Sequence, residues 1–156
     1  MNYTQIDITF QEVPNEVSLT ISIPGCSLRC EGCHSSFLWN KNSGNQLTEE
    51  LFIEKIVQYQ GLITCVCFLG GEWEERDLAN LLKIAKNYSL KTCLYTGEYD
   101  ASENLKNHLT YLKIGPWDIR RGGLDSQFTN QKFINVETQE CLNHLFQTNS
   151  EGVHTC

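Results

Sequence analysis

The sequence predicts an α/β domain built on a largely parallel, curved sheet. Segments with a strand pattern alternate with segments of helical pattern along the chain, as they do in other α/β domains. One strand candidate, residues 62–69, is apolar at every position but Thr64, which is typical of a strand buried on both faces of a parallel sheet. The 156 residues contain no repeat, low-complexity tract or linker, so we expect a single domain over residues 1–156.

The first elements along the chain are two strands and a helix. Residues 3–10 alternate loosely and predict a short strand. Residues 17–23 alternate apolar and hydroxyl side chains and predict a second strand, which ends at Pro24. Thr48 is placed to cap a helix, whose apolar residues recur at helical spacing until Gly61 stops it.

The later elements alternate in the same way after the apolar strand. They are a helix that ends near Tyr88, a strand over 91–97, a short helix near 102–109, strands over 111–115 and 132–136, and a final helix over 137–147. The active residues of such sheets gather at the carboxyl ends of the strands. The loop after Pro24 and the segments 70–72 and 95–97 all follow such ends, so we expect them to meet at one rim.

Charge and hydropathy restrict the partners. The chain has 12 basic and 19 acidic side chains. Its net charge of −7 argues against binding to nucleic acid, because a protein that binds nucleic acid needs a basic face. No apolar run approaches the length of a membrane span, and the first ten residues lack the features of a signal peptide. We therefore expect a cytoplasmic protein that binds neither nucleic acid nor membranes.

Three cysteines are concentrated in eight positions, "CSLRCEGC", as Cys26, Cys30 and Cys33. Three thiolates can hold three irons of a 4Fe–4S cluster, which leaves the fourth iron with an open position for a small molecule. A structural zinc site, with His34 or a distant cysteine as the fourth ligand, is the alternative. Such zinc sites favour paired C-x2-C knuckles from two segments, and this chain has no second pair.

The other five cysteines are dispersed. Cys65, Cys67 and Cys93 lie in apolar strands, where a free thiol packs as a small hydrophobic side chain. Cys141 and Cys156 have no role that the sequence identifies, and Cys156 is expected in a frayed C-terminus.

The C-x3-C-x2-C pattern directly after a strand resembles that of the radical S-adenosylmethionine enzymes. This resemblance implies that Cys26, Cys30 and Cys33 hold a 4Fe–4S cluster whose open iron binds S-adenosylmethionine, and that one electron cleaves this cofactor to a 5′-deoxyadenosyl radical. The implied fold is a partial, open (βα) barrel, because the chain is too short for a full barrel with a substrate-binding extension. Such a site encloses a small metabolite poorly, whereas a protruding loop of another protein could enter it.

The superfamily also carries a glycine–glycine–glutamate motif, and Gly70, Gly71 and Glu72 follow the apolar strand here. Two glycines let the backbone approach the cofactor without a Cβ, and a carboxylate can accept hydrogen bonds from its ammonium group. An ordinary βα turn with an exposed acid is the competing interpretation. Proline commonly follows the motif in the superfamily, whereas this chain has Trp73, whose role stays open.

The chain more closely resembles the small activating proteins of anaerobic (class III) ribonucleotide reductases. The shared motifs are the cysteine loop with Trp39 downstream, "YTG" at 95–97 and "TNQKFINV" at 129–136. The resemblance implies that the radical takes hydrogen from a glycine in a loop of the large reductase subunit, with a carrier such as flavodoxin as electron donor. The segment 115–128 departs from the family pattern.

Other interpretations stay open. The protein could act on another glycyl-radical enzyme or on a small molecule, or it could be a non-enzymatic iron–sulfur or zinc-binding protein. Trp39 is expected to pack as an anchor of the cysteine loop. Several polar or aromatic side chains could contact the cofactor or the partner, and the alternative for each is an exposed surface position, an ordinary turn or core packing. They are His34, Tyr95, Thr96, Arg120, Arg121, Asn130 and Gln131.

Overall fold

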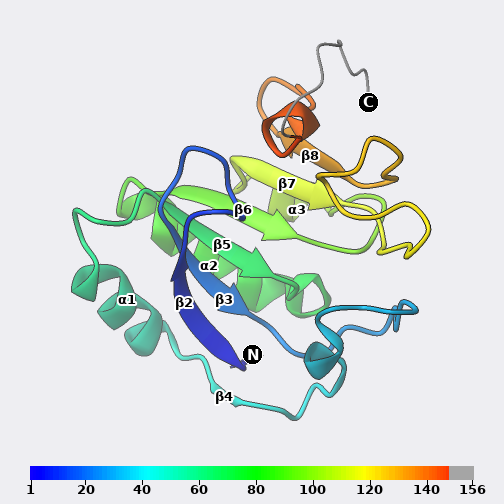
Figure 1. Ribbon diagram of the computed structural model, residues 1–156. Helices are drawn as coiled ribbons and strands as arrows, with labels where there is room; N and C mark the ends of the chain where they lie inside the picture. The colour runs from blue at the N-terminus through cyan, green and yellow to red at the C-terminus, as the bar shows by residue number, and fades with distance from the viewer. Residues whose placement is uncertain (148–156) are drawn as a thin grey trace.

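The computed structural model describes residues 1–147, and its main element is a six-stranded sheet (Figure 1). The strand order is β2-β3-β5-β6-β7-β8. Strands β3, β5, β6 and β7 run parallel, and the outer strands β2 and β8 are antiparallel to their neighbours. Their bounds are β2 Gln5–Thr9, β3 Ser18–Ser22, β5 Cys65–Leu69, β6 Lys91–Tyr95, β7 Tyr111–Ile114 and β8 Lys132–Asn135.

The mixed α/β class with a mostly parallel sheet is therefore confirmed. Within the described residues the sheet runs from one edge strand to the other, and no closed barrel is formed. The strand predicted over residues 3–10 is divided at Thr4: β1 (Asn2–Tyr3) pairs with β4 (Asn45–Gln46), and β2 joins the main sheet.

The α-helices lie on one face of the sheet, with α2 behind the central strands (Figure 1). They are α1 Glu49–Gln58, α2 Glu75–Asn87 and α3 Glu103–Lys106, and the 3₁₀ helices are η1 Ser36–Trp39, η2 Glu72–Glu74 and η3 Asn143–Leu145. Thr48 caps α1 as predicted, because its hydroxyl accepts the Leu51 N–H at 3.2 Å. No helix in residues 1–147 has the length and apolar content needed to cross a bilayer.

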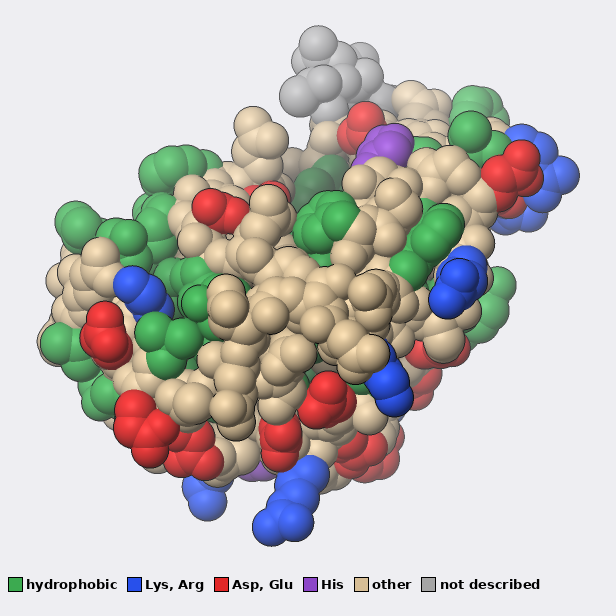
Figure 2. Space-filling view, turned by 90° about the horizontal axis from the view of Figure 1, so that it is seen from below, with side chains coloured by type: hydrophobic (Ala, Val, Ile, Leu, Met, Phe, Trp, Pro, Cys, Tyr) green, Lys and Arg blue, Asp and Glu red, His purple; other side chains and the backbone are tan. Residues whose placement is uncertain are grey.

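Strand β5 separates two hydrophobic clusters. Val66 and Phe68 pack in the cluster that contains the helix side chains, whereas Cys65 and Cys67 pack with Cys93 in a second cluster. All three thiols are fully buried and free, which confirms that these cysteines serve as core side chains. On the face of the molecule in Figure 2, acidic side chains gather along the lower edge and hydrophobic side chains are exposed in separate patches.

The final helix predicted over residues 137–147 is wrong. The Asn135 side chain accepts backbone N–H groups just after β8, but the chain takes a left-handed conformation at Gln139 (φ +59°) and turns back. Cys141 then forms an antiparallel bridge with Ile134, and η3 follows. The bridge places Asn143 beside the strand, which gives the β8 backbone a partner that helical spacing alone does not reveal. Cys156, expected in a frayed end, lies outside the described residues.

Candidate cofactor site

A cavity of about 340 Å³ opens at the carboxyl ends of the parallel strands. It is lined by residues of the three segments that were expected to meet: Cys26, Cys30, Cys33, Gly70, Glu72, Tyr95, Thr96 and Gly97. His34 and all three tryptophans of the chain also line it, as do Lys113 and Gln131. The structure thus brings the cysteine loop, the glycine–glutamate turn and the end of β6 around one space.

The cysteine loop is fixed at its start by backbone hydrogen bonds. The N–H groups of Gly25 and Cys26 both donate to the Leu38 carbonyl oxygen, at 2.6 and 3.1 Å. Gly25 has a φ of +125°, a conformation that residues with a side chain rarely adopt. Cys26, Cys30 and Cys33 are partly exposed and free, and burial raises the pKa of the Cys26 thiol. The three thiols are therefore accessible to a metal group.

No three His, Cys, Asp or Glu side chains among residues 1–147 lie together as ligands of a single ion. A 4Fe–4S cluster does not require that arrangement, because each of its cysteine ligands binds a different iron. The three thiols need only border one space large enough for the cluster, and the cavity provides that space.

The turn after β5 presents Glu72 to the cavity. Gly70 and Gly71 have φ values of +83° and +108°, and a Cβ added to Gly70 would lie 3.2 Å from the Ile23 carbonyl oxygen. One carboxylate oxygen of Glu72 accepts a hydrogen bond from the Thr96 hydroxyl. The other is buried and has no partner among the described residues. Burial raises the pKa of Glu72, and the bond from Thr96 partly opposes that shift.

Lys113 faces the same space from β7 and is a residue that the sequence analysis missed. Its side chain is buried, and its ammonium donates to the Gly115 carbonyl oxygen at 2.8 Å and the Thr96 carbonyl oxygen at 3.5 Å. Burial lowers its pKa to about 8, while the nearby Cys30 and Glu72 act in the opposite direction. The sequence signal that could have identified Lys113 is its position between Leu112 and Ile114 in an apolar strand, because lysine is rarely buried unless it is paired.

Aromatic rings form much of the cavity wall. The His34 ring lies 4.6 Å from the Trp117 ring at an interplanar angle of 47°, and His34 itself is exposed at the rim. Trp39 packs beneath the Arg29 guanidinium at 5.8 Å, as expected for an anchor of the cysteine loop. Trp117 lies in the segment 115–128, and the sequence alone had given it no role.

Buried polar atoms without partners are concentrated at this cavity. Seven side-chain atoms of this kind are found in residues 1–147, and four of them belong to residues that line the cavity: Glu12, Trp39, Glu72 and Trp117. Two are carboxylate oxygens and two are indole N–H groups. Because unpaired buried polar groups destabilise a fold, their concentration here marks a site prepared for a polar ligand.

The remaining candidates each contact other groups of the protein. Tyr95 borders the cavity, but its hydroxyl donates to the Glu12 carbonyl oxygen and its ring packs 6.0 Å from Phe133. The Asn130 amide donates to the Pro116 carbonyl oxygen at 2.9 Å and holds the turn after β7. Arg120 and Arg121 are exposed, and both pair with Asp118.

These residues fit a three-cysteine cluster with a zwitterionic cofactor. The cysteines supply thiolates, Glu72 has a free carboxylate oxygen for an ammonium group, and Lys113 offers a buried cation for a carboxylate. The positive φ values of Gly70 and Gly71 allow the backbone to border the cavity closely.

The arrangement defines a cluster-binding α/β domain, and comparison with known families agrees. Residues 16–114, more than half of the chain, match the family described as the 4Fe-4S single cluster domain, and the chain belongs to that family. It is also similar to the pyruvate formate-lyase-activating enzyme of Clostridium pasteurianum, with 29% identity over 89 residues. That match covers 53% of this chain and 37% of the relative. No solved structure matches the chain.

Proposed function

We propose that this protein is a radical S-adenosylmethionine activase that installs a glycyl radical on an anaerobic ribonucleotide reductase. The observation that carries the proposal is the single cavity that joins three free cysteines to the unpartnered Glu72 oxygen and the buried Lys113 ammonium. The family match supports the cluster, and the similarity to a glycyl-radical activating enzyme supports the class of reaction.

Each part of the cavity has a distinct role in this proposal. Cys26, Cys30 and Cys33 hold three irons of the cluster. Glu72 accepts hydrogen bonds from the cofactor ammonium, and Lys113 balances the cofactor carboxylate. When bound, the cluster and S-adenosylmethionine supply a carbon radical that can take the α-hydrogen of a glycine.

Aromatic and polar groups orient the rest of the cofactor. Trp117 and His34 offer flat surfaces for the adenine ring. Thr96 fixes the Glu72 carboxylate, so that its free oxygen keeps one direction. Gln131, a buried residue of the "TNQ" motif, also borders the cavity and is available to the ribose.

The client is proposed to enter as a glycine-tipped loop. The sheet is open, and exposed apolar side chains lie on the cysteine loop and next to it: Leu28 of the loop lies beside Gly97, and Ile119 lies beside Gly32 of the loop. Apolar side chains at the rim of a site favour a protein partner. The proposal takes residues 1–156 as one domain in the cytoplasm, where a carrier such as flavodoxin supplies the electron.

Coexpression under anaerobic conditions tests the client. The chain is paired with an anaerobic ribonucleotide reductase large subunit in one culture and with pyruvate formate-lyase, the client in the relative's name, in another. Electron paramagnetic resonance should show the glycyl doublet only in the culture that contains the reductase subunit. A doublet on pyruvate formate-lyase alone would transfer the proposal to that client, and a doublet on neither, with methionine still formed, would favour a small-molecule substrate.

A further inference from the structure

Trp73 directly follows the glycine–glycine–glutamate motif, and its indole lies between two glycines from different segments. A Cβ added to Gly25 would lie 2.5 Å from its Nε1 atom, and one added to Gly70 would lie 2.6 Å from its Cη2 atom. These atoms are at opposite ends of the ring system. The indole therefore spans the gap between the start of the cysteine loop and the turn after β5.

A directional bond fixes the ring in this gap. Nε1 of Trp73 donates to the Pro24 carbonyl oxygen at 3.1 Å, across 49 positions of sequence. Both flanking glycines have positive φ, so any side chain there would be strained as well as obstructed by the ring. Gly25 and Gly70 thus leave room for the indole. Contact with this one ring explains why both positions are glycine.

The contact joins the two groups that the cofactor must bridge. Cys26 follows Gly25 directly, and Glu72 precedes Trp73 directly. The backbone N–H of Cys26 also donates to the Leu38 carbonyl oxygen at 3.1 Å. A displacement of the indole would consequently move the first cluster ligand relative to the Glu72 carboxylate.

We propose that Trp73 is the positioning residue that fixes the cysteine loop against the Glu72 turn. The inference rests on the proposed function for its account of cofactor binding, but its effect on the cluster does not require that function. Misplacing a binding group by about 1 Å can cost about 100-fold in an enzyme reaction, so the spacing between Cys26 and Glu72 is a property worth fixing.

The test compares Trp73→Phe with Phe52→Leu. The phenyl ring retains part of the packing but loses the donor to Pro24 and the reach to Gly70. Phe52 is a fully buried aromatic side chain of α1 in the helix-side core, away from the cavity lining, so its truncation reports general destabilisation. Urea unfolding of the cluster-free chains measures the stability that each variant loses.

Two readouts separate positioning from stability. After anaerobic reconstitution, Trp73→Phe should bind the same amount of iron but lose it to a chelator about ten times faster than the wild-type chain. Its affinity for S-adenosylmethionine, followed by the change in the electron paramagnetic resonance spectrum of the reduced cluster, should fall by about tenfold or more. Phe52→Leu should change neither property at an equal or greater loss of stability.

Wild-type rates of iron loss in Trp73→Phe, or equal effects of the two variants, would overturn the inference. A wild-type cluster that does not respond to S-adenosylmethionine would instead remove the proposed function. In that case the rate of iron loss to the chelator still decides the role of Trp73, because this rate depends on how firmly the cysteine loop is fixed and not on cofactor binding.

Discussion

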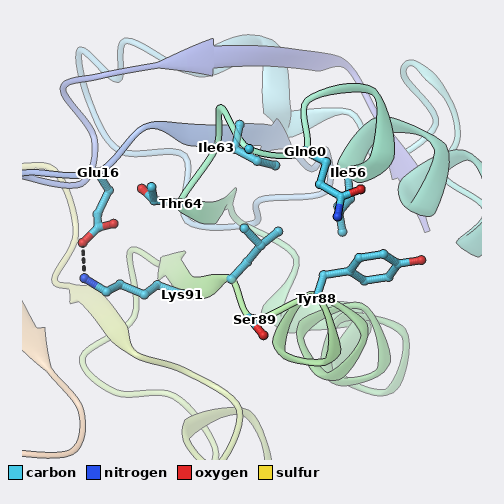
Figure 3. A pocket seen from close by; sticks show the side chains of 10 residues that line it. Glu16, Ile56, Gln60, Ile63, Thr64, Tyr88, Ser89 and Lys91 are labelled. Atoms are coloured by element: carbon cyan, nitrogen blue, oxygen red, sulfur yellow. Dashed lines mark hydrogen bonds and ion pairs between the residues drawn. The ribbon is translucent and has the colours of Figure 1, made fainter.

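Two cavities at opposite ends of the sheet differ in how their charged groups are paired. The cavity at the carboxyl ends contains a Glu72 oxygen and two indole N–H groups without partners. A pocket of about 390 Å³ lies at the amino ends of β5 and β6, and there Glu16 and Lys91 face each other and form an ion pair (Figure 3). Glu16 is nearly buried in that pair, and the Tyr111 hydroxyl adds a second contact at 3.4 Å.

The difference shows that burial of a charge does not by itself identify a binding site. The amino-end pocket satisfies its own carboxylate, so its charges stabilise the fold without a ligand. The carboxyl-end cavity leaves Glu72 half satisfied and gives Lys113 only carbonyl partners in the described residues. Its unpaired polar atoms gain partners only when something binds.

The largest expected effect is the loss of iron binding when cysteines at the carboxyl-end cavity, but not at the amino end of the sheet, are replaced. Alanine at Cys26, Cys30 or Cys33 should abolish nearly all iron binding, because each thiolate holds one iron of the cluster. Alanine at Cys65, a buried thiol at the amino end of β5, should leave iron binding intact and cost about 1 kcal/mol of stability. Iron and sulfide analysis after anaerobic reconstitution measures this, and full iron content in all three loop variants would contradict the cluster site.

The two buried carboxylates should respond oppositely to amide replacement. Burial raises the pKa of Glu72, so the folded chain loses this proton less readily than the unfolded chain and the cofactor-free fold is destabilised as pH rises above the ordinary value of 4.5. Glu72→Gln should therefore stabilise the cofactor-free chain at pH 7 and weaken S-adenosylmethionine binding by about 10- to 100-fold. Glu16→Gln should destabilise the chain by about 1 kcal/mol and leave cofactor affinity unchanged. Urea unfolding and cofactor titration measure both; a destabilised Glu72→Gln chain would refute the contrast.

The sequence predicted the parallel strands and the convergence at their carboxyl ends because these follow from local patterns. Residues 65–69 are apolar throughout, and this strand directs alternate side chains into two buried clusters, as expected. The final helix failed because Asn143 pairs with the β8 backbone, accepting the Phe133 N–H at 2.8 Å. That long-range contact overrides the helical spacing of residues 137–147.

The site was predictable as far as its motifs extended. The cysteine loop and residues 70–72 were recognised because each is a short, dense pattern. Lys113 and Trp117 were not, because each is a single residue whose neighbours in space lie far away in sequence. The role of Trp73 likewise depends on glycines 48 and 3 positions earlier, which no local pattern relates.

Lys113 should show the same conflict between stability and binding as Glu72, but with the opposite charge. Its pKa of about 8 lies below the ordinary value of 10.5, so the unfolded chain binds more protons between these values and stability rises with pH there. Lys113→Met should remove that rise and lower cofactor affinity by about tenfold or more. Guanidinium unfolding between pH 7 and 10.5 measures the slope. A wild-type slope in the variant would show that Lys113 is not the group responsible.

The smallest effect is expected at the paired end. The hydrogen bond to Glu16 raises the pKa of Lys91 above 10.5, so the pair stabilises the fold below pH 10.5 and loses that contribution as pH rises through the raised pKa. Because half of the Lys91 side chain is exposed, Lys91→Met should cost at most about 1 kcal/mol at pH 7 and less in 1 M salt. Lys83→Met, at an exposed position of α2, is the matched control. If the cost at Lys91 persisted unchanged above its raised pKa and in high salt, packing of its stem rather than its charge would stabilise the amino-end pocket.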